Sequence, residues 1–361
     1  MELWQGTPDS GWQAAQEELE ALGLTDGLPV VPPTRARVEA MLDACRFAAD
    51  GVVCDLAPLL RPATWRDIAI NAVMAGCRPG CLPVIAAALE AMAAGEFNLI
   101  GIATTTGSAA PLVIVNGPVA ARLGMNGAAN ALGPGNRANA TIGRAVSLCL
   151  RNIDGATPGE VDMATLGQPA KYTCCFAENE AQSPWTPLHV ERGYAADDSV
   201  VTVAGISGTV EVVDSSSNEG EDIAQTIAQS MLIAGTVGGA GLLGGGEPLV
   251  ILPPELAAAC ERAGCSKGRL KALIFERAAL SLDRLSPAVR KHLVGRGAAV
   301  GEGPGGSVLR AAQKAEDVMI VVAGGAGVKA TYAPTWGGGT RAVSRLVRQG
   351  TGAGGRETRD K

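Results

Sequence analysis

Two cysteines, a carboxylate and a histidine are the residues of this 361-residue chain whose types and positions could carry covalent or acid–base chemistry. Cys77 lies in a turn between two expected helices, just before a helix that Pro83 opens. A helix start and the adjacent Arg78 would lower the pKa of a thiol and favour its thiolate. The sequence therefore predicts Cys77 as a nucleophile or acid–base group. The alternative is a small thiol buried between packed helices.

Glu178, Cys175 and His189 are the other candidates for catalysis. The segment Tyr172–Ala177 is expected to be a strand, on which neighbouring side chains point to opposite faces, so only one of Cys174 and Cys175 could face a cleft. Glu178 follows the strand directly, where a partly desolvated carboxylate is a good general base. A solvated acidic loop and a structural histidine are the alternatives for Glu178 and His189.

Glycine-rich turns and cations predict a site for a small anion. The segment Gly133–Asn139 enters a helix, and backbone N–H groups at such a start can hold a phosphate or a carboxylate, although a plain helix cap would look the same. The sequence contains no strict nucleotide-binding fingerprint and no zinc-type cysteine and histidine spacing, so we expect no cofactor and no metal. The expected anion-binding residues are Arg78, Thr105, Arg137, Asn139, Arg144, Gly325 and Lys329.

The elements expected around these residues occur twice in the same order. In each of the two occurrences, a helix and a glycine-rich loop precede the sequence Pro-Leu-Val-Ile, which lies at 111–114 and at 248–251, and a long helix follows. Each occurrence then reaches an apolar strand, Tyr172–Ala177 or Val318–Ala323. This order predicts an α/β fold with two similar lobes, an internal structural duplication, and glycine-rich loops that line a cleft between the lobes.

The predicted domains are a first α/β lobe at residues 1–195, a second at 196–349 and a disordered tail at 350–361. The apolar residues of Val200–Val213 alternate around two glycines, which predicts a hairpin that begins the second lobe.

Composition limits the partners. The chain is 47% hydrophobic and 18% charged, as in folded proteins, and its net charge of −6 lacks the basic footprint of a nucleic-acid-binding protein. Apolar stretches are interrupted before 18 residues, and the N-terminus lacks the features of a signal peptide. The nine cysteines show no disulfide-module spacing. We therefore expect a cytoplasmic homo-oligomer without nucleic-acid or membrane partners.

Four stretches have the appearance of family motifs: Ile70–Pro79, Arg137–Arg144, Ser183–Trp185 and Pro187–Gly193. From Gly27 to about Gly327 the chain resembles a thinly characterised bacterial family that accompanies UGSC-motif (seleno)proteins. The resemblance implies thiol or selenol chemistry nearby and a UGSC-motif partner protein, and it assigns no catalytic role to any residue. Gly80-Cys81 stands where the family pattern has an acidic and an aromatic residue.

These observations lead to three hypotheses. The first is an enzyme that acts on a small anionic metabolite by cysteine-assisted hydrolysis, hydration or elimination in the interlobe cleft, where backbone N–H groups could hold an oxyanion. In it, Cys77 acts with Glu178. The second is a thiol redox protein, or a subunit that serves a (seleno)cysteine partner, in which Cys77 and Cys81, or Cys175, exchange disulfides. The third is a non-catalytic ligand-binding protein.

Overall fold

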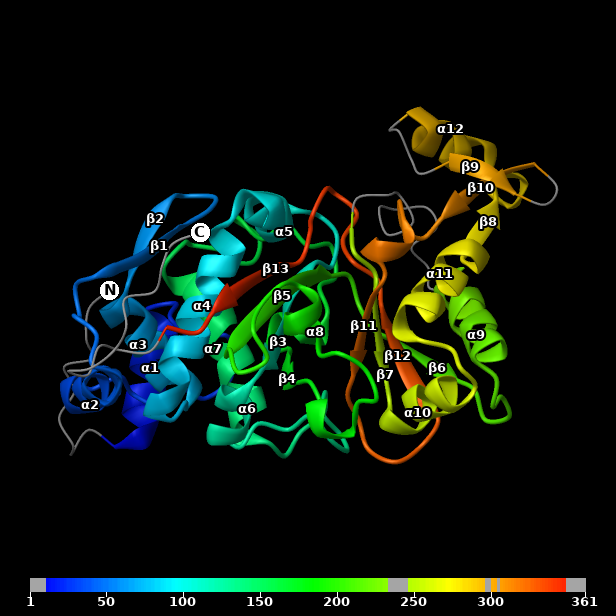
Figure 1. The fold of residues 1–361 in the computed structure, drawn as a ribbon. Helices are drawn as coiled ribbons and strands as arrows, with labels where there is room; N and C mark the ends of the chain where they lie inside the picture. The colour runs from blue at the N-terminus through cyan, green and yellow to red at the C-terminus, as the bar shows by residue number, and fades with distance from the viewer. Residues whose placement is uncertain (1–10, 233–245, 296–299, 304–305, 349–361) are drawn as a thin grey trace.

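Four layers in the order helix, sheet, sheet, helix make up the body of the computed structural model, which describes residues 11–232, 246–295, 300–303 and 306–348 (Figure 1). The strands of the first sheet, in order, are β13 (Val343–Leu346), β5 (Val200–Ile206), β3 (Ala110–Asn116) and β4 (Cys175–Ala177). Those of the second sheet are β11 (Met319–Val322), β7 (Leu249–Leu252), β12 (Lys329–Ala333) and β6 (Val210–Val213). The predicted mixture of helix and sheet is confirmed.

Side-chain alternation along the strands creates the layers, because successive residues of a strand face opposite sides of its sheet. On β3, Val113 and Val115 pack into the first helical layer, whereas Leu112 and Ile114 face the second sheet. The other strands divide in the same way, and buried aliphatic side chains with Phe176 fill the space between the sheets. The two sheets therefore meet as packed faces over most of their area.

Helices cover the outer face of each sheet. The first layer consists of α3 (Trp65–Ala75), α4 (Leu82–Ala93) and α7 (Arg137–Asn152), and the second of α9 (Gly220–Leu232), α10 (Pro254–Arg262) and α11 (Lys267–Arg277). A capping box between Thr64 and Asp67 begins α3, and Gly76 ends it at a φ of 87°.

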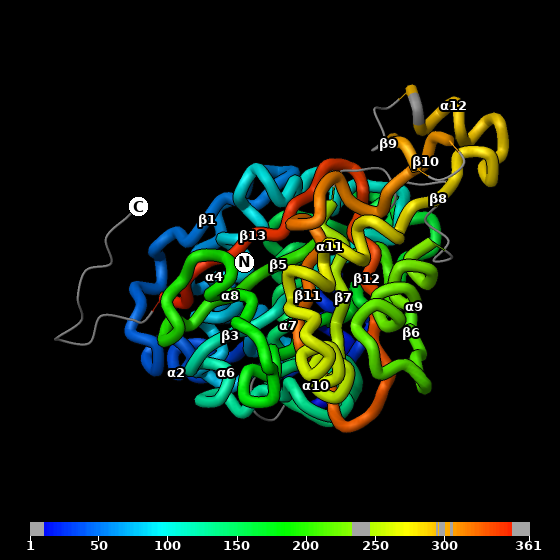
Figure 2. Tube along the Cα trace, turned by 45° about the vertical axis from the view of Figure 1, so that its right-hand side comes forward, coloured from blue at the N-terminus to red at the C-terminus, as the bar shows by residue number. Residues whose placement is uncertain are grey.

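The remaining elements lie around this body. The helices are α1 (Trp12–Ala21), α2 (Arg35–Cys45), α5 (Leu99–Thr104), α6 (Pro118–Arg122), α8 (Leu188–Glu191) and α12 (Pro287–Gly295). The strands are β1 (Val52–Leu56), β2 (Arg61–Thr64), β8 (Ala279–Ser281), β9 (Val300–Gly303) and β10 (Gly306–Arg310). The small sheet β8-β10-β9 and α12 project from the second half of the molecule (Figure 2).

Within the described ranges, no helix taken alone has the length and apolar character required to cross a bilayer. The consecutive segments Pro79–Ala93 and Gly95–Thr104 reach that length and composition only together, with a bend of 74° between them.

The two main sheets have the same pairing pattern. In the orders β4-β3-β5-β13 and β11-β7-β12-β6, the first pair is parallel and the next two pairs are antiparallel. Val113 pairs with Cys175 on one side and Val203 on the other. Val250 pairs in the same way with Ile320 and Tyr332. The two Pro-Leu-Val-Ile segments thus occupy equivalent positions in their sheets.

The hairpin predicted at Val200–Val213 is wrong, because β5 and β6 belong to different sheets. The strand that follows β5 lies beside β12, and the strand that follows β12 lies beside β5. The chain crosses from sheet to sheet where the Ser207 N–H donates to the Pro334 carbonyl oxygen and the Trp336 N–H donates to that of Gly205. This exchange could not be predicted from the sequence. Two short strands with alternating apolar residues and a glycine turn between them have the same sequence pattern whether they pair with each other or join different sheets. The first sheet therefore takes strands from both sides of residue 195.

Part of the sequence prediction falls outside the described residues. The expected tail at 350–361 and nearly all of the glycine-rich loop expected at 235–246 lie there.

Asp154, just after α7, is a buried carboxyl group whose effect on stability should depend on pH. Its Oδ1 accepts a hydrogen bond from the Leu59 N–H, and burial raises the pKa of the carboxyl to about 6 against the lowering effects of that bond and of Arg61. Because the folded-state pKa lies above the ordinary value, the contribution of this group to stability is greatest in acid and is lost as the pH rises through about 6. Asp154→Asn should therefore gain stability relative to the wild type between pH 5 and pH 7.5, as measured by urea unfolding. The exposed Asp197→Asn should follow the wild type at every pH, and parallel curves for Asp154→Asn would refute the assignment.

Candidate active site

The carboxyl ends of β3 and β4 hold a cluster of buried polar side chains. Asn116 is the last residue of β3, and Glu178 directly follows the parallel strand β4. The Asn116 Nδ2 donates to Glu178 Oε2 at 2.6 Å and to Glu180 Oε1 at 3.0 Å. The Gly117 N–H also donates to Glu180 Oε1, at 2.7 Å. Ligands of α/β proteins bind at such strand ends, so the topology places these groups where chemistry is expected.

The helix α8 brings a histidine to the same cluster. Its first residue, Leu188, donates its backbone N–H to Glu178 Oε2 at 2.8 Å. The next residue, His189, is fully buried, and its Nδ1 lies 4.0 Å from Glu180 Oε1. Glu178 and His189, which the sequence predicted separately, are therefore brought together around Glu180.

Several polar atoms of this cluster have no hydrogen-bond partner in the part of the chain that the structure describes. They are Glu178 Oε1, Asn116 Oδ1 and both ring nitrogens of His189. Buried polar atoms are almost always hydrogen-bonded, and an unpaired one costs about 1–3 kcal/mol. Four such atoms on three neighbouring residues form a concentrated, enclosed set of donors and acceptors without partners among the described residues.

The environment of Glu178 favours its protonated form. Burial raises the pKa of the carboxyl, and this effect outweighs the lowering effects of the Lys267 ammonium, the Asn116 amide and the Leu188 N–H. A carboxyl group with a raised pKa is a stronger base when it is ionised, which suits the role of a general acid or base.

Lys267 connects the cluster to the second half of the molecule. It lies at the start of α11, and its Nζ is 2.7 Å from Glu191 Oε2 and donates to the Thr186 carbonyl oxygen. Lys271, one turn later, also pairs with Glu191. The second half thereby supplies the positive charge nearest to Glu178.

A cavity of about 620 Å³ lies at the rim of the inter-sheet layer, between loops of the two halves. The segment Asn130–Gly133 lines one side, and the turn from Gly324 to Lys329 lines the other. The Gly324 N–H donates to the Gly127 carbonyl oxygen, and the Asn179 N–H donates to that of Val322, both at 2.8 Å. These bonds join the loops around the cavity to the segment that carries Glu178, although Asn116, Glu178 and His189 do not themselves line it.

Two of the predicted anion-binding residues, Gly325 and Lys329, line this cavity. A Cβ atom on Gly325 would lie 2.7 Å from the Cβ of Ala129, so glycine is required for the two loops to meet. Asn139 does not face the cavity but holds its wall, because its Nδ2 donates to the Asn126 and Ala131 carbonyl oxygens.

The other predicted anion-binding residues are dispersed over the first half. Arg137 donates twice to the Gly76 carbonyl oxygen at the end of α3, and Arg144 forms two hydrogen bonds with the carboxylate of Asp26. The Thr105 Oγ1 accepts from the Gly107 N–H, and Arg78 is exposed before α4. The structure does not bring these four residues to the cavity.

The predicted activation of Cys77 is wrong. Cys77 is buried in the first helical layer, its Sγ donates to the Thr141 carbonyl oxygen at 3.2 Å, and burial raises its pKa well above the ordinary value. Cys81 has the lowered pKa instead, and the neighbouring Cys77 side chain is the largest cause. Cys175 faces the helices from β4, and burial raises its pKa well above the ordinary value too. The helix start was predicted correctly, but the aliphatic packing around the sulfur decides its protonation.

The rate of alkylation tests whether Cys77 is a buried, unreactive thiol. In native protein at pH 8, iodoacetamide should label Cys77 at least about 100-fold more slowly than a free cysteine, because a buried thiol is inert. Peptide mass spectrometry after timed quenching would give the rate, and labelling in urea is the control for intrinsic reactivity. Native labelling at the free-cysteine rate would contradict the burial.

Asn116, Glu180 and Lys267 belong to the cluster but were not predicted from sequence. The signal for Asn116 was present: a polar residue ends a strand whose other residues are apolar, directly before Gly117-Pro118. The contribution of Lys267 depends on the packing of α11 and has no local signal.

A metal site does not emerge from the described residues, among which no group of three or more histidine, cysteine or acidic side chains is placed to bind an ion. Comparison of the chain with protein-family models, with curated proteins and with solved structures finds no match.

Proposed function

We propose that the chain is an enzyme that moves a proton on a small anionic metabolite in a hydration or elimination reaction, with Glu178 as the acid–base group. The observation that carries this proposal is the Glu178 carboxyl itself. It is buried at a strand end, one oxygen is fixed by Asn116 and Leu188, and the other has no partner among the described residues. Fixing one oxygen of a carboxylate orients the other toward a substrate.

The cluster contains the groups that elimination requires. The Glu178 carboxylate would take the proton from the carbon next to the carbonyl or carboxylate group of the substrate. The electron pair left on that carbon forms the double bond, and the hydroxyl group on the adjacent carbon leaves as water with a proton from His189. Hydration is the reverse. A positioned acid–base group contributes about 100- to 10,000-fold to such reactions.

The negative charge of the substrate would be held at the rim cavity by Lys329 and by the N–H groups of Gly325 and Ala326, since those of Gly324 and Gly327 donate to Gly127 and Glu255. One amide of this turn already binds a carboxylate of the protein, since the Gly327 N–H donates to Glu255 Oε2 at 2.8 Å. Backbone N–H groups in a glycine-rich turn form concave sites for anions, which supports this assignment.

An internal duplication is part of the same proposal. The equivalent registers of the two Pro-Leu-Val-Ile segments support it, as does the reciprocal exchange of β6 and β13. In a duplicated fold the rim cavity is the interlobe site, with acid–base groups from the first half and anion-binding groups from the second.

Deuterium incorporation tests the proposal without knowledge of the natural substrate. The protein is incubated in deuterium oxide with a panel of hydroxy, oxo and unsaturated carboxylates, and each compound is analysed by mass spectrometry. We expect at least one compound to gain a deuteron at the carbon next to its carboxylate, or to gain or lose water. A panel that is unchanged after long incubation with folded protein would overturn the proposal.

A second candidate, thiol exchange with a partner protein such as a UGSC-motif protein, is favoured by the proximity of Cys77 to Cys81 and by the lowered pKa of Cys81. The Cys81 thiolate would attack a disulfide of the partner and release one of its thiolates. Cys77 would then displace the other, which leaves an internal disulfide and a reduced partner. Mass spectrometry after mild treatment with oxidised glutathione should find the Cys77–Cys81 disulfide, and two free thiols would rule this candidate out.

A further inference from the structure

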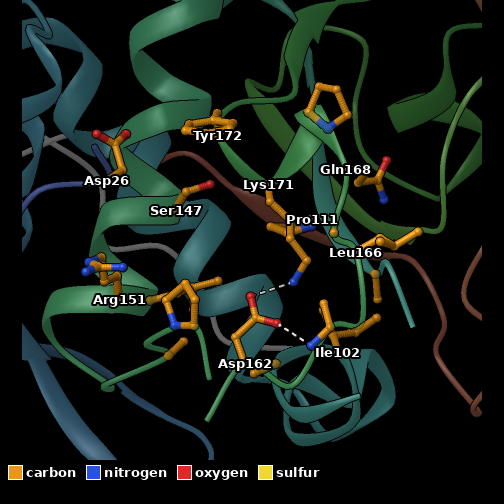
Figure 3. A pocket seen from close by; sticks show the side chains of 18 of the residues that line it. Asp26, Ile102, Pro111, Ser147, Arg151, Asp162, Leu166, Gln168, Lys171 and Tyr172 are labelled. Carbon is orange, nitrogen blue, oxygen red and sulfur yellow. Dashed lines mark hydrogen bonds and ion pairs between the residues drawn. The ribbon is translucent and has the colours of Figure 1, made fainter. Parts of the chain in front are cut away.

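A second cavity, of about 600 Å³, lies at the opposite end of β3 from the Glu178 cluster (Figure 3). Pro111, near the start of β3, lines it, whereas Asn116 ends the strand at the cluster. Five residues of extended strand span roughly 17 Å. The cavity is therefore separate from the proposed active site.

The walls of this cavity are mainly apolar. Ile102 and Ala103 of α5, Leu150 of α7 and the start of β3 form its inner side, and the loop that leads from α7 to β4 forms its outer side. Its size and lining match those of pockets that enclose small organic ligands.

The two carboxylates at its wall are paired with cations. Asp162 pairs with Lys171 at 2.6 Å, and Figure 3 shows the two side chains directed at each other within the cavity. The Asp26 carboxylate is bound by Arg144, which does not line the cavity, and together with backbone hydrogen bonds this pairing outweighs burial and holds the pKa of Asp26 below the ordinary value. Arg151, whose Nε donates to the Gly23 carbonyl oxygen, is then the one cation of the lining that no described carboxylate binds. A cationic ligand would find no counter-charge here.

Large apolar side chains are exposed at the mouth. Leu166 is 94% exposed and Tyr172 is 49% exposed, and both line the cavity. The hydroxyl group of Ser147 points into the space between Tyr172 and Lys171 (Figure 3). A ligand that enters would cover the apolar groups at the mouth and meet one hydroxyl group inside.

We propose that this cavity is a binding site for a mainly apolar small molecule without a positive charge, which carries one hydrogen-bonding group that Ser147 receives. Apolar burial supplies the affinity, at about 25 cal/mol per Å² of surface removed from water. Binding requires neither Glu178 nor the rim cavity, so its test is independent of the proposed catalytic function.

Nile red, an uncharged dye that fluoresces in apolar surroundings, is the probe. It should bind the full-length protein and be displaced by 1-octanol. Octylammonium, which has the same chain with a positively charged end, should require at least about 10-fold higher free concentrations, because its charge loses its hydration in the cavity without gaining a partner. Displacement by octylammonium as effective as by octanol would overturn the assignment to a ligand without a positive charge.

Two variants locate the bound dye. Ser147→Phe fills the cavity from α7 and should weaken Nile red binding at least about 10-fold, or about 1.4 kcal/mol. Leu166→Asp places a charge at the mouth without disturbing the core, since Leu166 is almost fully exposed, and should also weaken binding. Ser230→Phe, a matched change on α9, should leave binding unchanged. Equal binding by all four proteins would show that the dye binds elsewhere and would refute the proposal.

Discussion

Replacing Glu178 with glutamine should lower the rate of the reaction found by deuterium exchange by about 100- to 10,000-fold, the contribution expected of a positioned acid–base group. Glutamine keeps an oxygen that can accept the hydrogen bonds from Asn116 and Leu188, but it cannot take up a proton. The loss should appear in kcat more than in KM, because the variant retains the rim cavity that would bind the substrate. Steady-state kinetics with the identified compound would measure the effect.

Three comparisons make this result specific. Glu178→Asp, which keeps the carboxyl but shortens its reach, should retain more activity than the glutamine variant. Glu20→Gln, an exposed change on α1, should match the wild type. The pH dependence of kcat in the wild type should show a group with a pKa above that of an ordinary glutamate, and this feature should disappear in Glu178→Gln. Wild-type rates in a folded Glu178→Gln protein would exclude Glu178 from catalysis.

The largest loss of stability is expected from Gly117→Ala. Gly117 follows Asn116 at a φ of 80°, and a Cβ atom there would lie 2.0 Å from the Asp198 carbonyl oxygen. At this φ and a ψ of −169° the backbone has a conformation that essentially only glycine adopts, which costs a side chain about 1–3 kcal/mol, and the overlap with a main-chain atom adds about 1–3 kcal/mol. We therefore expect a loss of about 3 kcal/mol or more in the free energy of unfolding, measured with urea.

Gly124→Ala separates the two causes. Gly124 also has a positive φ, of 62°, but a Cβ atom on it would meet no atom within 4 Å. This variant should lose only about 1–2 kcal/mol, the cost of the backbone conformation alone. Equal losses in the two variants would mean that the chain relaxes away from Asp198 and that the tight passage beside Asn116 is not required.

The helices and strands themselves could be predicted from the sequence better than the pairing of the strands in sheets. Helix ends are specified by neighbouring residues along the chain, and the helix that Pro83 was expected to open is present as α4. The exchange of β6 and β13 depends on contacts between residues far apart in the chain, for which a short alternating strand carries no signal.

The same division applies to the site. Glu178 was predicted because its position after a strand is a local property, and His189 because histidine is rare in this chain. The state of Cys77 was mistaken because a thiol pKa depends on all the atoms around the sulfur, whereas the sequence shows only its neighbours along the chain. Lys267 was missed for a related reason, since only the packing of α11 against α8 brings its charge near Glu178.

The place of β13 has a consequence for synthesis on the ribosome. This strand, which completes the first sheet, is among the last described parts of the chain to be made, whereas β3, β4 and β5 emerge much earlier. Until β13 arrives, the outer edge of β5 presents unpaired backbone groups, and an open edge of this kind invites pairing with other chains. We therefore expect nascent or C-terminally truncated chains to depend on chaperones and to aggregate far more readily than the finished protein.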